Sequence, residues 1–175
     1  MKYEPNLHIV LHQPDIPPNT GNIGRTCVAI GAKLWMVLPL GFSLDAKQLR
    51  RAGLDYWPHL DYEVVDDWPA LLRALPAERM WFVEKDGGRR YCEVEYRRGD
   101  ILVFGSETSG IPAEWMREHA ARTIRLPMRR EVRSINLASS AAAVAYEALR
   151  QLVVTRQIPD FPDAWNPAPF AAQKE

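Results

Sequence analysis

Short apolar runs recur along the chain, separated by polar turns and by segments with helical spacing. The runs occupy residues 7–11, 34–38, 62–65, 80–83, 101–104 and 123–126. Most lack the strict alternation of a half-exposed strand, and this favours strands that are buried on both faces. Such strands alternate with helices in α/β proteins. The pattern therefore predicts an α/β fold with a mostly parallel sheet of about six strands and helices on both faces.

Helix-capping residues place the predicted helices between these runs. The helices should cover residues 19–30, 46–53 and 68–75, a short stretch after Pro112, and residues 136–155. Asn19 should cap the first helix, and Gly31 should end it in a left-handed conformation. Asp67 should cap the helix that follows it.

The length of 175 residues fits one domain, which we place at residues 1–157, followed by a Pro-rich tail at 158–175. No apolar run approaches the roughly 18 residues of a membrane span, and the first residues lack the pattern of a signal peptide. The two cysteines form no CxxC motif, and the four histidines show no metal-ligand spacing. We therefore expect a cytoplasmic protein without a metal site.

The charge is balanced, with 22 basic and 22 acidic residues, and this argues against a general nucleic-acid coat protein. The basic residues are nevertheless clustered, within residues 47–51, 85–90, 97–98 and 129–133. Each cluster could be an ordinary solvated surface. Four clusters together make at least one anion-binding patch an expectation.

The stretch PPNTGNIGR at residues 17–25 places two glycines at the start of the first predicted helix. A helix start with free N–H groups can bind a phosphate. However, neither the dinucleotide fingerprint nor the P-loop motif is present, so a nucleotide cradle is disfavoured. Asn22 and Arg25 are three residues apart and share one helix face. Arg25 could be a surface residue there, or it could grip a phosphate.

Two further stretches carry candidate chemistry. FGSETSGIP at residues 104–112 follows the most apolar strand, where open α/β sheets bind ligands, and it contains Glu107 between two glycines. An exposed flexible loop is the alternative interpretation.

IRLPMRREVRSINLASS at 124–140 joins a strand, a basic loop and a polar helix start. The helix that follows has an alanine-rich face, which would let another helix or a ligand approach closely.

Together with LRRAGLDYW at 49–57, these three stretches resemble the motifs of the SPOUT class of RNA methyltransferases. The resemblance is strongest to the bacterial YibK-like group, the tRNA 2′-O-methyltransferases of the wobble nucleotide. It implies a deep trefoil knot in the C-terminal third, which patterns could not indicate because knots are nearly absent from protein folds. It also implies S-adenosylmethionine bound in the knot, a homodimer packed partly through the last helix, and the tRNA anticodon loop as substrate.

The resemblance also implies roles for particular residues. The cofactor should be held by Val83, Gly105, Leu126 and Ser134. The methyl-transfer site should contain Glu107, Ser134 and Asn136, with Arg25 facing the ribose. Asn22 matches the asparagine of the family's Asn-x-x-Arg pair, in which Arg25 is the arginine. The phosphates of the RNA should be gripped by Arg50, Arg51, Arg129, Arg130 and Arg133.

The resemblance leaves alternatives open, and it raises a chemical difficulty. The chain could instead methylate another tRNA or rRNA site, or be a non-catalytic RNA-binding module of the same fold. The family proposal makes Arg25 the base, but a guanidinium stays protonated in proteins and so cannot readily accept a proton. We therefore expect Arg25 to clamp the neighbouring phosphate and stabilise the developing alkoxide, with the proton passing to phosphate or water.

Overall fold

One parallel sheet runs through the protein. The computed structural model describes residues 4–43 and 55–159. The strands are β1 (Leu7–His12), β2 (Lys33–Val37), β3 (Tyr62–Val65), β4 (Met80–Val83), β5 (Arg89–Arg90), β6 (Asp100–Phe104) and β7 (Thr123–Arg125). They form a seven-stranded sheet in the order β3-β2-β1-β6-β4-β7-β5. Every described pair is parallel, which confirms the predicted α/β fold.

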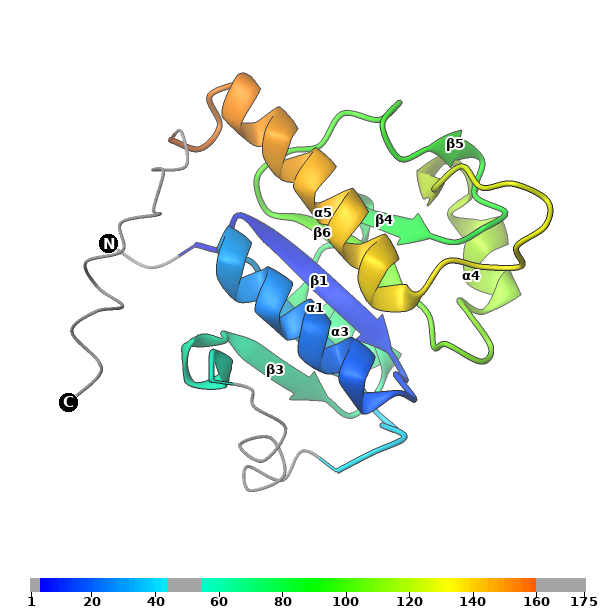
Figure 1. Ribbon diagram of the computed structural model, residues 1–175, viewed down its shortest axis with the longest axis horizontal. Helices are drawn as coiled ribbons and strands as arrows, with labels where there is room; N and C mark the ends of the chain where they lie inside the picture. The colour runs from blue at the N-terminus through cyan, green and yellow to red at the C-terminus, as the bar shows by residue number, and fades with distance from the viewer. Residues whose placement is uncertain (1–3, 44–54, 160–175) are drawn as a thin grey trace.

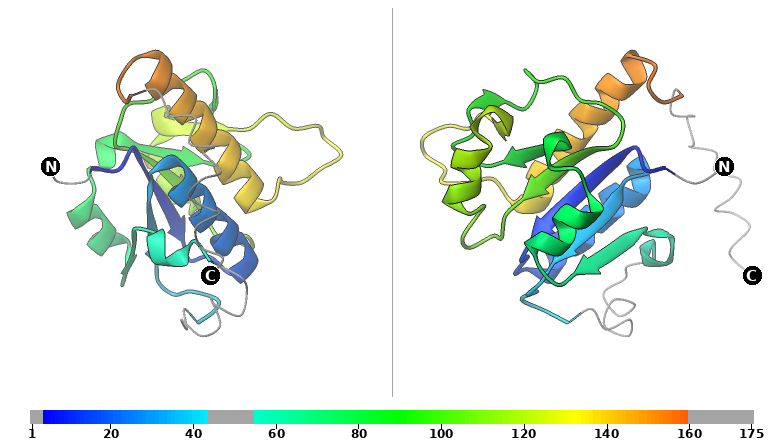
Figure 2. Two further views of the ribbon diagram at one scale, coloured as in Figure 1. Left: turned by 60° about the vertical axis from the view of Figure 1, so that its left-hand side comes forward. Right: turned by 180° about the vertical axis from the view of Figure 1, so that it is seen from behind.

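Helices cover both faces of this sheet (Figures 1 and 2). They are α1 (Pro17–Ile30), α3 (Trp68–Ala74), α4 (Ala113–Glu118) and α5 (Leu137–Val154), with 3-10 turns η1 (Trp57–His59), η2 (Ala77–Arg79) and η3 (Ala120–Arg122). Helices α1 and α5 lie side by side on one face, and α3 and α4 lie on the other. Each face has its own buried apolar cluster, so both sides of the strands are covered, as their continuous apolar runs predicted.

Local capping signals were correct for two helix ends and wrong for a third. Gly31 follows α1 with a φ of 66°, and the Asp67 carboxylate accepts a hydrogen bond from Ala70 N at 2.7 Å. Asn19 does not cap α1, because the helix already begins at Pro17 and its N-cap is Ile16. Proline favours the first helical position, where its missing N–H costs no hydrogen bond. The predicted helix at 46–53 and nearly all of the Pro-rich tail lie outside the described residues.

The alanine-rich face of α5 is buried within its own chain. Ala141, Ala145 and Ala148 have no exposed surface and belong to the core between α5, α1 and the sheet. The expectation that this face would let another helix approach closely is confirmed within the chain, because α1 packs against α5 here. Small side chains here let α5 pack closely onto its own domain. Among the large apolar side chains, α5 exposes Tyr146 and Val154.

Strand β7 lies between β4 and β5, although β5 follows β4 in the sequence. The chain thus leaves β4, passes to the far edge of the sheet at β5 and returns to β6 on the other side of β4. Gln151 of α5 binds the segment between β5 and β6, since it accepts a hydrogen bond from Tyr96 N and donates one to Val94 O. The trefoil knot itself stays a prediction.

Candidate active site

The carboxyl ends of β6, β4 and β7 are neighbours, because these parallel strands are adjacent in the sheet. Val83 is the last residue of β4, and Gly105 and Leu126 directly follow β6 and β7. The structure therefore brings together three of the four predicted cofactor residues. They offer apolar side chains and main-chain groups, which suits a flat aromatic ring that needs apolar contact on its faces and hydrogen bonds at its edge.

The loop after β6 is folded tightly on itself. A Cβ atom at Gly105 would overlap the Gly110 carbonyl group, and Ser106 and Gly110 form an isolated β-bridge. Gly110 adopts a φ of 67°, and the Glu84 carboxylate accepts a hydrogen bond from Ile111 N at 3.1 Å. Gly105 thus permits close approach by the loop's own backbone.

Glu107 projects from this loop to the start of α1. Its carboxylate accepts hydrogen bonds from Asp15 N at 2.8 Å, Ile16 N at 3.3 Å and Asn19 Nδ2 at 2.8 Å. The free N–H groups at the start of a helix attract an anion, and here the Glu107 carboxylate is that anion. The start of α1 is therefore filled by Glu107 and does not cradle a nucleotide phosphate.

Asn19 connects Glu107 to the start of α5. It is 6% exposed, and its Oδ1 accepts a hydrogen bond from Asn136 Nδ2 at 2.9 Å. The Asn136 Oδ1 accepts one from Ser139 N at 3.1 Å and so caps α5, as the sequence allowed. The Glu107–Asn19–Asn136 bridge therefore joins three of the four stretches that carry the resemblance.

From the sequence, Asn19 was expected only to cap α1, and Asn22 was assigned to the site. Asn22 is exposed on α1, and its carbonyl oxygen accepts a hydrogen bond from Thr26 Oγ1. The signal for Asn19 was present in the two prolines before it. Because proline favours the first helical turn, Pro17 places Asn19 inside the helix, where its side chain is free to bind elsewhere.

Arg25 is held on a different part of α1. Its side chain is 59% exposed, and its Cζ lies 4.6 Å from the centre of the Tyr56 ring. Its Nη2 is 3.9 Å from Asp55 Oδ1. Helix geometry separates Arg25 from Asn19 by about 9 Å along the axis and about 120° around it. The structure therefore does not bring Arg25 to the Glu107–Asn19–Asn136 bridge within one chain.

The basic loop between β7 and α5 extends away from the body of the protein (Figure 2, yellow). It carries Arg129, Arg130 and Arg133, all exposed, and the exposed Ser134. Arg129 pairs with Glu131 at 3.2 Å, but both side chains are exposed, so this ion pair is weak. The loop thus presents cations to solvent. The other two predicted RNA contacts, Arg50 and Arg51, lie outside the described residues.

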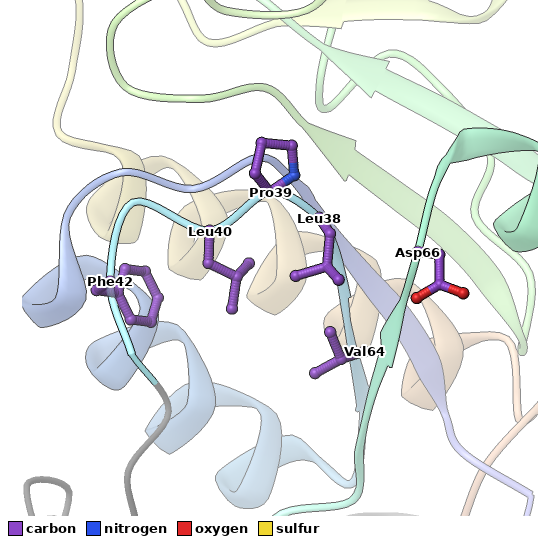
Figure 3. Close-up of a pocket in the computed structure, with 6 residues that line it drawn as sticks. All are labelled: Leu38, Pro39, Leu40, Phe42, Val64 and Asp66. Atoms are coloured by element: carbon purple, nitrogen blue, oxygen red, sulfur yellow. The ribbon is translucent and has the colours of Figure 1, made fainter.

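A hollow of about 540 Å³ lies elsewhere along the same edge of the sheet (Figure 3). It is lined by Leu38, Pro39, Leu40, Phe42, Val64 and Asp66. These residues belong to the segments around the ends of β2 and β3, and none of them is a predicted site residue.

The part of the chain at residues 4–43 and 55–159 contains no group of three or more histidine, cysteine, aspartate or glutamate side chains arranged to hold a metal ion. It also contains no helix whose length and hydropathy would let it span a membrane.

The SpoU rRNA Methylase family matches the chain over residues 6–146. The chain belongs to this family. A relative from Methylovorus glucosotrophus, named tRNA (cytidine(34)-2′-O)-methyltransferase, is 48% identical over 147 residues, covering 82% of this chain and 94% of the relative. A Saccharophagus degradans protein with the same name is 44% identical, with 83% and 96% covered.

Solved structures agree with this SpoU assignment. One that concerns 2-OH methylation of C/U34 on tRNA matches with a TM-score of 0.79 and 45% identity, covering 85% of this chain and 97% of that one. The SpoU methyltransferase AviRb from Streptomyces viridochromogenes, in complex with its cofactor AdoMet, matches with a TM-score of 0.73 and 25% identity, covering 86% and 59%. The fold of this SpoU protein is thus that of known methyltransferases.

In this SpoU protein, replacing Asn19 with aspartate is expected to lower the free energy of unfolding by about 2 to 3 kcal/mol at pH 7. The substitution keeps the side-chain shape but removes the donor that lies 2.8 Å from Glu107 Oε1. Two carboxyl groups this close cannot both ionise, so one keeps its proton, with a pKa above its value in the unfolded chain. The destabilisation is therefore smallest below about pH 4 and grows as the pH rises through that raised pKa.

Urea unfolding of the variant and the natural protein from pH 4 to pH 8 measures this effect. Asn22→Asp is the matched control, because Asn22 is exposed on the same helix. We expect the control to change stability by less than about 0.5 kcal/mol. An equal loss in both variants, or a loss at Asn19 that does not vary with pH, would show that the bridge has been misassigned.

Proposed function

We propose that this SpoU-family protein transfers a methyl group from S-adenosylmethionine to the ribose 2′-hydroxyl of the tRNA wobble nucleotide, position 34. The observation that carries the proposal is the match to relatives named for this activity, at 48% identity along 94% of the relative's length. The substrate base would be cytidine or a modified uridine.

The strand ends at Val83, Gly105 and Leu126 would hold the cofactor. Val83 is buried and Leu126 is half-buried, and no charged side chain is among the three, which fits a neutral adenine ring. When bound, S-adenosylmethionine supplies an electrophilic methyl group. Ser134 and Asn136 would line the place where the ribose meets this group. Holding the two reactants in line provides much of the acceleration in such a displacement.

Arg25 would bind the phosphate beside the target ribose and stabilise negative charge on the 2′-oxygen. A guanidinium group is a donor only, so the proton leaves to phosphate or water. Arg25 and the Glu107–Asn19–Asn136 bridge lie on different faces of α1. That separation supports a homodimer, in which two chains together complete the site around one ribose.

The exposed arginines at 129, 130 and 133 would contact phosphates of the anticodon loop, together with Arg50 and Arg51. Such contacts position the RNA, and their strength falls as salt rises. We place the protein in the cytoplasm, and the free thiols of Cys27 and Cys92 agree with a reducing compartment.

The purified protein should transfer radiolabelled methyl from S-adenosylmethionine to tRNA, with label confined to the 2′-oxygen of nucleotide 34. Nuclease digestion followed by mass spectrometry of the fragments locates the methyl group. A tRNA that is already 2′-O-methylated at position 34 is the control and should accept no label. Label at another tRNA position or in rRNA would favour a different target within the family. RNA binding without any transfer would favour a non-catalytic module.

A further inference from the structure

Asp55 and Tyr56, which belong to the segment of the resemblance at residues 49–57, lie against Arg25. Tyr56 directly precedes η1, and its ring lies under the guanidinium group of Arg25 at 4.6 Å. An arginine side chain that is 59% exposed would otherwise sample many rotamers. Stacking on an aromatic face restricts the guanidinium plane while leaving its N–H donors free.

The Tyr56 ring is itself fixed to α1. Its hydroxyl donates a hydrogen bond to the carbonyl oxygen of Gly21, one helical turn before Arg25. Only 9% of Tyr56 is exposed, and burial raises the pKa of its hydroxyl, so the group stays a neutral donor. The ring therefore connects two successive turns of the same helix.

Gly24 allows this arrangement. A Cβ atom at this position would lie 3.0 Å from Leu60 Cδ2 and 3.3 Å from Trp57 Cζ3, which is tighter than ordinary contact. The absence of a side chain thus lets the segment from Tyr56 to Leu60 lie directly on α1. The second glycine of PPNTGNIGR makes room for the residues that support Arg25, and it is not part of a phosphate cradle.

We propose that Tyr56 is a positioning residue that holds the Arg25 guanidinium in the orientation needed for methyl transfer. The inference rests on the proposed function, in which Arg25 contacts the RNA at the reacting ribose. Asp55 adds opposite charge at 3.9 Å, but its side chain is 86% exposed, so that pair is weak and the ring is the main support.

Tyr56→Leu removes the ring and should lower kcat about 5- to 20-fold without changing the KM for S-adenosylmethionine. Tyr56→Phe keeps the ring and loses only the hydroxyl contact with Gly21, so kcat should fall by no more than about threefold. If the ring positions Arg25, then Tyr56→Phe must retain most of the kcat that Tyr56→Leu loses. Equal losses in the two variants would overturn the proposal.

A double-mutant cycle separates positioning from a merely structural role. In the Arg25→Ala background, Tyr56→Leu should cause no further loss of kcat, because the residue through which it acts is gone. The same 5- to 20-fold loss in both backgrounds would mean that Tyr56 acts independently of Arg25, and the proposal would fail.

A measurement without substrate distinguishes failure of this inference from failure of the proposed function. The ring current of Tyr56 should shift the Arg25 side-chain proton resonances upfield, and the shift should persist in Tyr56→Phe and vanish in Tyr56→Leu. Random-coil values in the natural protein would refute the contact even if Tyr56→Leu failed to fold. Upfield resonances in a protein that methylates no tRNA would leave the contact standing and overturn the proposed function.

Discussion

Arg25→Ala is expected to lower kcat for methyl transfer to tRNA by about 100-fold or more while binding S-adenosylmethionine normally. A charged donor aimed at developing negative charge contributes about this much in enzymes that stabilise an oxyanion. The cofactor residues at the ends of β4, β6 and β7 come from other elements, so their arrangement does not depend on Arg25. Single-turnover methylation measures the first effect, and calorimetry with the cofactor measures the second.

Two companion variants sharpen this experiment. Arg25→Lys keeps the positive charge but loses the planar group that stacks on Tyr56, so an intermediate activity is expected. Arg73→Ala removes an exposed arginine from α3, on the opposite face of the sheet, and should leave the activity unchanged. Full activity in Arg25→Ala would rule out the assigned role. Comparable losses in Arg25→Ala and Arg73→Ala would point to a general effect of charge on RNA binding.

Gly105→Ala is expected to reduce the free energy of unfolding by about 3 kcal/mol or more. The added Cβ would lie well within 3.0 Å of the Gly110 carbonyl group and of Ile111 N. These are backbone atoms of a tight loop that cannot rotate away as a side chain could. Accommodation would therefore require the Ser106–Gly110 bridge to open. Urea unfolding without cofactor measures the loss separately from any effect on binding.

Gly88→Ala is the matched control for that substitution. A Cβ at Gly88 would meet Thr123 Oγ1 at 3.4 Å, which is ordinary van der Waals contact. Replacing a glycine without strain reduces the entropy of the unfolded chain, so this variant should be unchanged or stabilised by up to about 1 kcal/mol. Similar destabilisation of both variants would contradict the close approach of the loop to its own strand.

Local sequence patterns predicted most of the secondary structure, because strand periodicity and helix capping depend on residues near one another. The run at 62–65 and the cap at Asp67 appear in the structure where they were predicted. Strand β5 was missed because it has only two residues, Arg89 and Arg90, both exposed. A segment that short has no periodicity to detect.

The candidate site was predicted less completely. The loop that contains Gly105 was singled out by a general property of open α/β sheets, which bind ligands at strand ends, whereas Gly105 and Leu126 were assigned to the cofactor by the resemblance. The role of Asn22 came from the resemblance, and its spacing to Arg25 on a helix could not tell which helix face is buried. In the folded protein the buried face carries Asn19, and Asn22 is exposed.

The sequence by itself determined the α/β class, the alternation of strands and helices and most of their ends, since these depend on local periodicity and backbone preferences. Tertiary structure decided which polar side chains meet. Asn19 and Asn136 are 117 positions apart in sequence, and Tyr56 and Gly21 are 35 apart, yet each pair is joined by a hydrogen bond. A local pattern carries no information about such partners, because the strand order and helix packing that bring them together depend on the whole chain.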